Sequence, residues 1–303
     1  MPLSSRPGIR RMATFRGAAP GPWAEYRSQR RRPILRPRFL PRPDLWPDEG
    51  LFAAWLGHST VLLKVDGFTI LTDPVLGDRC GISVGNVTVG LKRLVAPALD
   101  TSALPHIDLI LLSHAHLDHF DTRTLRLLEH SKTTVITAAN TSDLLRRRRR
   151  YREIREIGWD QETRLGPLHL RGFPVRHWGA RMQTDVYRGY NGYLIEAGRR
   201  RIVFGGDTAL TDSFRALKTS RPVDLAIMPI GAYNPWINAH CNPEQALQMT
   251  NDCGAEFVLP VHHQTFHLSR EPYREPVERM LAAAGAHEDR VSLTEIGQEW
   301  KLR

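Results

Sequence analysis

The sequence Ser113-His114-Ala115-His116-Leu117-Asp118-His119 places three histidines and one aspartate within six consecutive positions. Histidine nitrogen and carboxylate oxygen bind Zn²⁺ at about 2.0–2.2 Å, and a site with few thiolates and an open position is typical of catalytic zinc. The segment contains no cysteine. Its density of ligand side chains therefore predicts a catalytic metal centre, which we expect to hold two divalent cations.

The residues on either side of this segment place it in a loop. Residues 107–112 form a short apolar run typical of a buried strand, and residues 121–128 combine capping residues with helically spaced leucines. In an extended segment, residues i and i+2 point the same way, so the two histidines on either side of Ala115 can bind one ion. The bend toward the helix turns Asp118 and His119 toward a second position.

The HAHLDH segment resembles the metal-binding motif of the metallo-β-lactamase-fold hydrolases. Three later segments follow in that family's order, namely Val175-Arg176-His177-Trp178, Phe204-Gly205-Gly206-Asp207-Thr208 and Pro260-Val261-His262-His263-Gln264-Thr265-Phe266. The similarity spans roughly residues 51 to 285 and implies an α/β fold, the four-layer αββα sandwich. Carried over by position, it implies a first metal held by His114, His116 and His177, a second held by Asp118, His119 and His262, and Asp207 bridging both.

Three of the implied ligands have alternatives in the sequence. His169 lies eight residues before His177, and the resemblance favours His177 because the family places its ligand at a strand end. His262 and His263 point to opposite faces if extended, so at most one of them binds a metal, and the resemblance selects His262. Asp207 follows a strand that runs into two glycines, which allow close backbone approach; an ordinary turn aspartate is the alternative.

A second set of segments resembles the group that contains N-acyl-phosphatidylethanolamine phospholipase D. The ascorbate 6-phosphate lactonase group is similar over some of them, and both groups act on phosphate-bearing substrates. The segments are Trp55 to Thr60, Leu71 to Val75, Pro229 to Tyr233 and His240 to Ala246. The resemblance implies that Asp73 supports a metal-binding histidine through a hydrogen bond. An Asp-Pro pair such as Asp73-Pro74 is also common in plain turns.

Two further histidines are candidates for the site. His240 immediately precedes a predicted helix, because Asn242 is a good cap and Pro243 suits the first helical position. The resemblance implies that His240 contacts substrate or stabilises developing charge, whereas a surface loop histidine is the alternative. His58 lies between two predicted strands and is either a turn residue or a neighbour of the site.

Two close cations imply hydrolysis. They lower the pKa of bound water to about 7 and, at about 3.5–4 Å apart, stabilise both attacking and leaving oxygens. We expect a metal-bridging hydroxide that Asp118 and Asp207 help to position, with His240 stabilising the oxyanion or assisting the leaving group. Phosphodiester hydrolysis of the phospholipase D type is the first expectation, and lactone or other ester hydrolysis is the second. Zn²⁺ suits these ligands, as do Mn²⁺ and Fe.

The length of 303 residues is sufficient for one large core, and we expect a single hydrolase domain over residues 51–303. Composition and apolar spacing predict helices over residues 244–251 and 276–284. Strand-like apolar runs recur at 52–56, 60–65, 68–71, 107–112, 133–137, 192–196, 201–205, 223–230 and 256–261.

Residues 1–50 form a basic, proline-rich leader. They contain eleven Arg and no Lys against four Asp plus Glu, so they contribute +7 of the formal net charge of +10. Their apolar residues are scattered, and we expect this leader to be extended or poorly ordered. It contains no long apolar stretch typical of a secretory signal, and no run approaches transmembrane length. Cytoplasmic localisation is the expectation, and an organelle transit peptide is the alternative.

Residues 146–150 form a run of five arginines. A solvated helix face is the default interpretation, and attraction to an anionic membrane surface or to a phosphate-bearing substrate is the functional one. Nucleic acid would respond to the same charge. A nucleic-acid-binding protein with a degenerate hydrolase core is thus a rival hypothesis, and a nuclease is a third. The complete ligand set and the lack of an RNA-recognition or zinc-finger motif make nucleic acid the weaker hypothesis.

Overall fold

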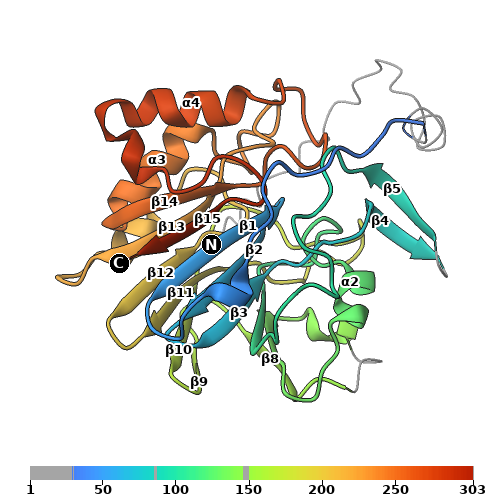
Figure 1. The fold of residues 1–303 in the computed structure, drawn as a ribbon, viewed down its shortest axis with the longest axis horizontal. Helices are drawn as coiled ribbons and strands as arrows, with labels where there is room; N and C mark the ends of the chain where they lie inside the picture. The colour runs from blue at the N-terminus through green and yellow to red at the C-terminus, as the bar shows by residue number, and fades with distance from the viewer. Residues whose placement is uncertain (1–28, 30, 85–86, 146–149, 303) are drawn as a thin grey trace, which may run out of the picture.

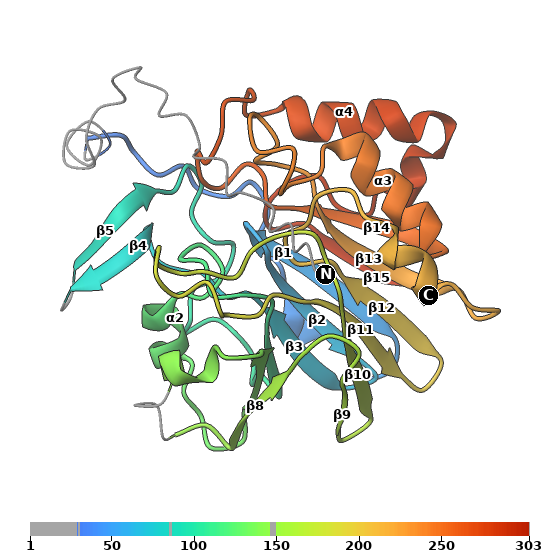
Figure 2. The same cartoon turned by 180° about the vertical axis from the view of Figure 1, so that it is seen from behind.

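The computed structural model describes residue 29 and residues 31–84, 87–145 and 150–302, and these form a sandwich of two sheets (Figure 1). The first sheet has seven strands in the order β15-β1-β2-β3-β6-β7-β8, and the second has six in the order β14-β13-β12-β11-β10-β9. Helices α3 and α4 cover the outer face of the second sheet, and α2 lies beside the first (Figures 1 and 2). The predicted αββα sandwich is confirmed.

The first sheet changes from antiparallel to parallel pairing between β3 and β6. Its strands in chain order are β1 (Leu51–Gly57), β2 (Thr60–Val65), β3 (Phe68–Thr72), β6 (Leu109–Leu112), β7 (Thr134–Ala138), β8 (Glu153–Ile157) and β15 (Glu299–Leu302). Parallel strands end at the same edge of a sheet, so the chain leaves β3 and β6 at one edge.

The second sheet is also mixed, because β12, β13 and β14 are parallel and the others are antiparallel. Its strands are β9 (Glu162–Leu165), β10 (Leu168–Phe173), β11 (Gly192–Ala197), β12 (Arg200–Phe204), β13 (Val223–Pro229) and β14 (Ala255–Val261). The helices are α2 (Thr122–Leu127), α3 (Pro243–Asp252) and α4 (Glu275–Ala284), with short 3₁₀ turns at Pro43–Leu45, Ser142–Leu145, Asp212–Leu217 and Gly285–Arg290. A separate hairpin, β4 (Arg79–Val84) and β5 (Val87–Lys92), projects from the sandwich (Figures 1 and 2).

Strand β13 shows how one apolar run serves two cores. Leu225 and Ile227 belong to the cluster between the two sheets, whereas Ala226 and Met228 belong to the cluster under α3 and α4. Side chains alternate between the faces of a strand, so a strand covered on both faces must be apolar throughout. Burial on both faces therefore explains why such strands appear in the sequence as continuous apolar runs.

All nine predicted strands are confirmed, with ends within two residues of those expected. The helices predicted at 121–128, 244–251 and 276–284 are confirmed as α2, α3 and α4. Strands β4, β5, β8, β9, β10 and β15 were not predicted. Strand β8, Glu153–Ile157, is partly exposed and rich in charge, as edge strands often are, so it carries no apolar run to reveal it.

The predicted leader falls partly outside the described residues, which exclude 1–28 and 30. Its described part contacts the domain: Leu35 forms a bridge with Val95, and the buried Trp46 donates a hydrogen bond to Glu299. Contact with the domain therefore begins before Leu51. Of the arginine run, residues 146–149 lie outside the described residues. Among the described residues, every helix is too short or too polar to cross a bilayer.

Gly231 marks a close approach of two strand ends. A Cβ added there would lie 2.2 Å from the carbonyl oxygen of His262. We expect Gly231→Ala to lower the free energy of unfolding by about 1–3 kcal/mol, because the backbone must separate to accept the methyl group. Thermal unfolding with a chelator present measures the effect. Gly158→Ala is the control, since its Cβ would meet nothing closer than 3.6 Å. Equal melting temperatures for the two variants would refute the expectation.

Candidate metal centre

The HAHLDH loop, residues 114–119, is fixed at both ends. The buried strand β6 ends at Leu112, and α2 begins at Thr122 directly after its capping residue Asp121, whose side chain accepts hydrogen bonds from the backbone of Arg123 and Thr124. Between them, the carbonyl of His116 accepts hydrogen bonds from the backbone N–H groups of His119 and Phe120. This turn directs the first two histidines of the loop to one point and its last two residues to another.

The first cluster consists of His114, His116, His177 and Asp207. His116 Nδ1 lies 2.8 Å from His114 Nε2 and 3.2 Å from His177 Nε2. Asp207 Oδ2 lies 3.9 Å from His114 Nε2 and 3.8 Å from His177 Nε2. One ligand atom from each of these residues thus lies within 4.8 Å of the others.

The second cluster consists of His58, Asp118, His119 and His262, which also offer one ligand atom each within 4.8 Å. Asp118 Oδ2 lies 3.7 Å from His119 Nε2 and 3.6 Å from His262 Nε2. Asp207 Oδ2 is 3.1 Å from both of these nitrogens. One carboxylate oxygen, that of Asp207, therefore lies between the two clusters.

Asp73 holds one histidine of each cluster. Its Oδ2 accepts a hydrogen bond from His119 Nδ1 at 2.7 Å and from Ser113 Oγ at 2.5 Å. His114 Nδ1 in turn donates to the same Ser113 Oγ at 2.8 Å. In the first cluster, His177 Nδ1 donates to the carbonyl oxygen of Ala239 at 3.0 Å. Such bonds fix the tautomer and leave the opposite ring nitrogen facing the cluster.

The carboxylates of the site and its histidines shift each other's pKa values. Burial raises the pKa of Asp207, but the charges of His119 and His262 outweigh this effect and hold it well below its usual value. Burial lowers the pKa of His262, yet the carboxylates of Asp207 and Asp118 raise it to about 9. The carboxylates of Asp207 and Asp118 thus attract positive charge to one place, which a divalent cation would supply. Burial lowers the pKa of His114 and His177 well below the usual value, so these imidazoles are neutral, as ligation requires.

Unpaired atoms provide a direct test of whether metal ions fit. Within the described chain, Nε2 of His119, both ring nitrogens of His262 and Oδ1 of Asp207 are buried without a hydrogen-bond partner. Buried polar atoms are nearly always paired, so such a concentration needs an explanation. The donor set of imidazole nitrogen and carboxylate oxygen suits Zn²⁺, Mn²⁺ or Fe. The residues therefore fit metal ions.

The geometry brings all seven predicted ligands together and separates the two alternatives from them. His169 lies on β10, where it pairs with Glu162 at 3.0 Å. His263 points away from the clusters and stacks on Trp55, with ring centroids 4.4 Å apart. Neither belongs to a cluster, because strand register and the alternation of faces direct these side chains elsewhere.

His240 lies at the boundary of both clusters. Its ring centroid is 5.0 Å from that of His177 and 5.3 Å from that of His262, and its Nδ1 is 3.8 Å from Asp207 Oδ2. Burial lowers the pKa of His240 to about 4, so the ring is neutral. The predicted cap follows directly: Asn242 and Gln245 form a reciprocal capping box at the start of α3. The surface-loop alternative is wrong, since His240 is only 6% exposed.

Arg181 is a supporting residue that the sequence did not reveal. Its Nη1 donates hydrogen bonds to the carbonyl oxygens of Ala115 at 2.9 Å and Phe120 at 2.8 Å. It thereby ties the HAHLDH loop to the segment that follows His177. Its partners are backbone atoms, so no residue type in the sequence marks the contact in advance.

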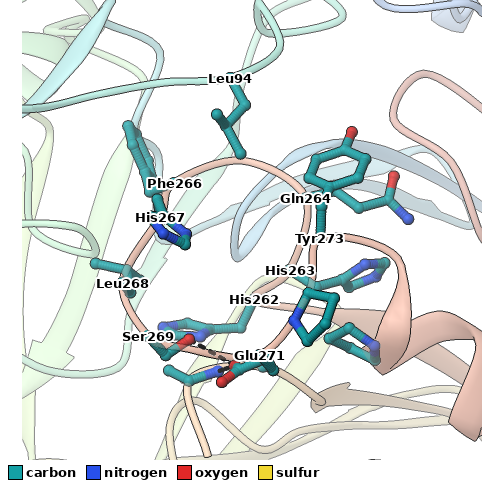
Figure 3. Close-up of a pocket in the computed structure, with 14 residues that line it drawn as sticks. Leu94, His262, His263, Gln264, Phe266, His267, Leu268, Ser269, Glu271 and Tyr273 are labelled. Atoms are coloured by element: carbon teal, nitrogen blue, oxygen red, sulfur yellow. Dashed lines mark hydrogen bonds between the residues drawn. The ribbon is translucent and has the colours of Figure 1, made fainter. Parts of the chain in front are cut away.

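Glu271 is a second such residue. Its carboxylate accepts hydrogen bonds from the backbone of Ala232 at 2.5 Å and of Asn234 at 3.2 Å, and from Ser269 Oγ at 2.6 Å. It fixes the loop that leads to His240. Figure 3 shows this carboxylate at the edge of a cavity of about 40 Å³ beside His262. That cavity has room for only a few water molecules.

The two-sheet sandwich and the His/Asp clusters at the ends of strands from both sheets are those of a metal-dependent hydrolase of the metallo-β-lactamase type. The chain belongs to the β-lactamase superfamily, because the model of the Beta-lactamase superfamily domain matches residues 69–263. The predicted family is therefore confirmed, as is the expectation of a metal-dependent hydrolase.

Relatives extend over most of the chain. An uncharacterized protein of Mycobacterium tuberculosis is 36% identical over 255 residues, which cover 82% of this chain and 68% of the relative. N-acyl-phosphatidylethanolamine-hydrolyzing phospholipase D 1 of Caenorhabditis elegans is 29% identical over 273 residues, which cover 81% of this chain and 73% of the relative. A UPF0173 metal-dependent hydrolase of Bacillus cereus is 29% identical over 235 residues, covering 72% and 88%.

Solved structures share the fold. Igni18, a metallo hydrolase from Ignicoccus hospitalis, superimposes with a TM-score of 0.63 at 20% identity. The match covers 84% of this chain and 99% of Igni18. Isothiocyanate hydrolase from Delia radicum gut bacteria has a TM-score of 0.65 at 16% identity, covering 83% and 98%. Their likeness concerns architecture, because one fold hosts many chemistries.

Asp73→Ala tests the support of the clusters. We expect the affinity for Zn²⁺, measured by competition with a chromophoric chelator, to fall about 10–100-fold, because His119 and Ser113 lose their acceptor. Asp108→Ala is a matched control, since Asp108 accepts hydrogen bonds from Thr69 at the opposite end of β6. An Asp73→Ala protein that binds Zn²⁺ as tightly as the control would show that Asp73 is only a turn residue.

Proposed function

We propose that this hydrolase uses two divalent cations to cleave a phosphodiester bond in a phospholipid-like substrate. The observation that carries the two-cation proposal is the position of Asp207, whose Oδ2 lies within 3.9 Å of ligand nitrogens in both clusters. A single carboxylate placed in this way is suited to bridging. In this proposal the first ion is held by His114, His116, His177 and Asp207, and the second by Asp118, His119, His262 and Asp207.

Two bound cations of this kind acidify water and stabilise the attacking and leaving oxygens of a displacement. Zn²⁺ is the cation we propose first, and Mn²⁺ and Fe suit the same donors. Asp118 and Asp207 act through their carboxylates as ligands that position the reacting groups. Asp73 and the carbonyl of Ala239 hold the histidine rings in the tautomers that ligation requires.

His240 is the residue we propose for charge stabilisation. Its Nδ1 is buried and has no hydrogen-bond partner within the described chain. A neutral imidazole can carry its proton on this nitrogen and donate it to a phosphoryl oxygen as negative charge develops there. Preorganised donors of this type act most strongly where water is excluded, and His240 is almost fully buried.

The substrate class rests on the relatives and on the mouth of the site. The C. elegans relative is named as a phospholipase D that hydrolyses N-acyl-phosphatidylethanolamine. Trp178 contacts the His116 ring, with centroids 4.7 Å apart, and is 43% exposed. A half-exposed indole beside a metal cluster offers an apolar surface to an acyl chain. Peripheral contact with an anionic membrane is part of this proposal, because residues 1–50 carry a net charge of +7.

A substrate panel with metal analysis tests the proposal. We expect two metal ions per chain in the purified protein and turnover of an N-acyl-phosphatidylethanolamine diester that exceeds turnover of phosphomonoesters and lactones. Chelation should abolish the activity and added Zn²⁺ should restore it. A preference for lactones would replace the proposed substrate and leave the site intact, whereas turnover that survives complete chelation would refute metal dependence.

His240→Ala tests the charge-stabilising role. We expect kcat to fall about 10²–10³-fold, as for the loss of one preorganised donor, with the metal content unchanged. His169→Ala, which removes a histidine remote from the clusters, should retain wild-type kcat. A His240→Ala protein with kcat within twofold of wild type would show that this assignment is wrong.

A further inference from the structure

His58 is built into the second cluster, although it occupies a short turn between β1 and β2. Its side chain is 1% exposed, and its Nε2 lies 3.0 Å from Asp118 Oδ2. Its ring centroid is 4.2 Å from that of His262 and 5.1 Å from that of His119. Phe266 packs edge-on against the same ring at 5.2 Å. The turn therefore places an imidazole among the candidate ligands of the second ion.

The backbone of this turn is also tied to the strand end that carries His262. The His58 N–H donates to Thr265 Oγ1 at 2.6 Å, and its carbonyl accepts from the His262 N–H at 3.0 Å. The same carbonyl accepts from Trp55 Nε1 at 2.7 Å. His58 and His262 both have positive φ, 52° and 64°. This left-handed backbone conformation is unfavourable for any residue other than glycine, and it persists only where the surrounding structure imposes it.

We infer that His58 is a positioning residue, which holds the Asp118 carboxylate through its Nε2–H and so sets the affinity of the second cluster for its metal ion. This inference rests on the proposed two-metal function. A carboxylate only accepts hydrogen bonds, so the bond requires the proton to be on Nε2 of His58. Asp118 needs such support, because its side chain is 18% exposed whereas those of His119 and His262 are no more than 1% exposed.

The contacts described here join His58 to Asp118 and His262, which belong to the second cluster. The effect of removing it should therefore be confined to one of the two ions. A role as a direct ligand is the competing interpretation, since one ring nitrogen of His58 lies within 4.8 Å of a possible ligand atom of each of the other three residues. The two roles differ in what a glutamine can replace: its amide N–H can donate to Asp118, whereas its neutral oxygen is a poor substitute for a ligating imidazole.

Zn²⁺ titration of chelator-stripped protein tests the inference without any substrate. We expect wild type to bind two ions, and His58→Ala to bind the second about 10–100-fold more weakly with the first unchanged. His58→Gln should bind both ions within threefold of wild type. His177→Ala identifies the other site, because it should weaken binding of the ion whose affinity His58→Ala leaves unchanged. Melting temperatures of the metal-free proteins measure the loss of stability caused by removing the buried imidazole ring, which both His58 variants share.

The failures are distinguishable. If His58→Ala binds both ions as wild type does, the positioning role is wrong and the two-metal proposal stands. If His58→Gln loses as much affinity as His58→Ala, the hydrogen-bond role is overturned in favour of direct ligation. If wild type binds a single ion, the two-metal proposal fails and this inference fails with it.

Discussion

The buried carboxylate of Asp207 is the constraint on which the site depends. A carboxylate that is 2% exposed must be compensated, and five histidine nitrogens lie within 3.9 Å of its Oδ2. Its position follows from Gly206, which has a φ of 57° and allows no Cβ, because one would lie 2.8 Å from Ser113 Cβ. The end of β12 thereby touches the end of β6, and the aspartate enters between the clusters.

The site belongs to both sheets. His58, Asp73 and the HAHLDH loop follow strands of the first sheet, whereas His177, Asp207 and His262 follow strands of the second. The meeting of the two clusters therefore depends on the packing of one sheet against the other, and the apolar cluster between the sheets keeps the two sets of candidate ligands in register. Supporting contacts such as those of Arg181 and Glu271 then hold individual loops.

Prediction from sequence was most complete where the signal is local. Residues 114–119 lie within one turn of each other, so their spacing is enough to predict two points of ligation. The buried strands were equally clear, since two-sided burial demands continuous apolar residues, as in β13. Strands β8, β9 and β10 were not predicted, because they are partly exposed and their charged residues are compatible with loops. The contacts of Arg181 and Glu271 with backbone atoms leave no pattern in the sequence.

The sequence by itself determined the metal-binding character of the chain, the loop that supplies four of the seven candidate ligands, and the apolar strands of a two-sheet core. Only the tertiary structure brought His177 and His262 into the clusters and directed His169 and His263 away from them, and only it placed His58 against Asp118. The physical reason is the separation of the interacting residues along the chain. Local spacing sets the direction of neighbouring side chains, whereas the meeting of residues 46 to 207 positions apart depends on strand register and on the close approach of two sheets.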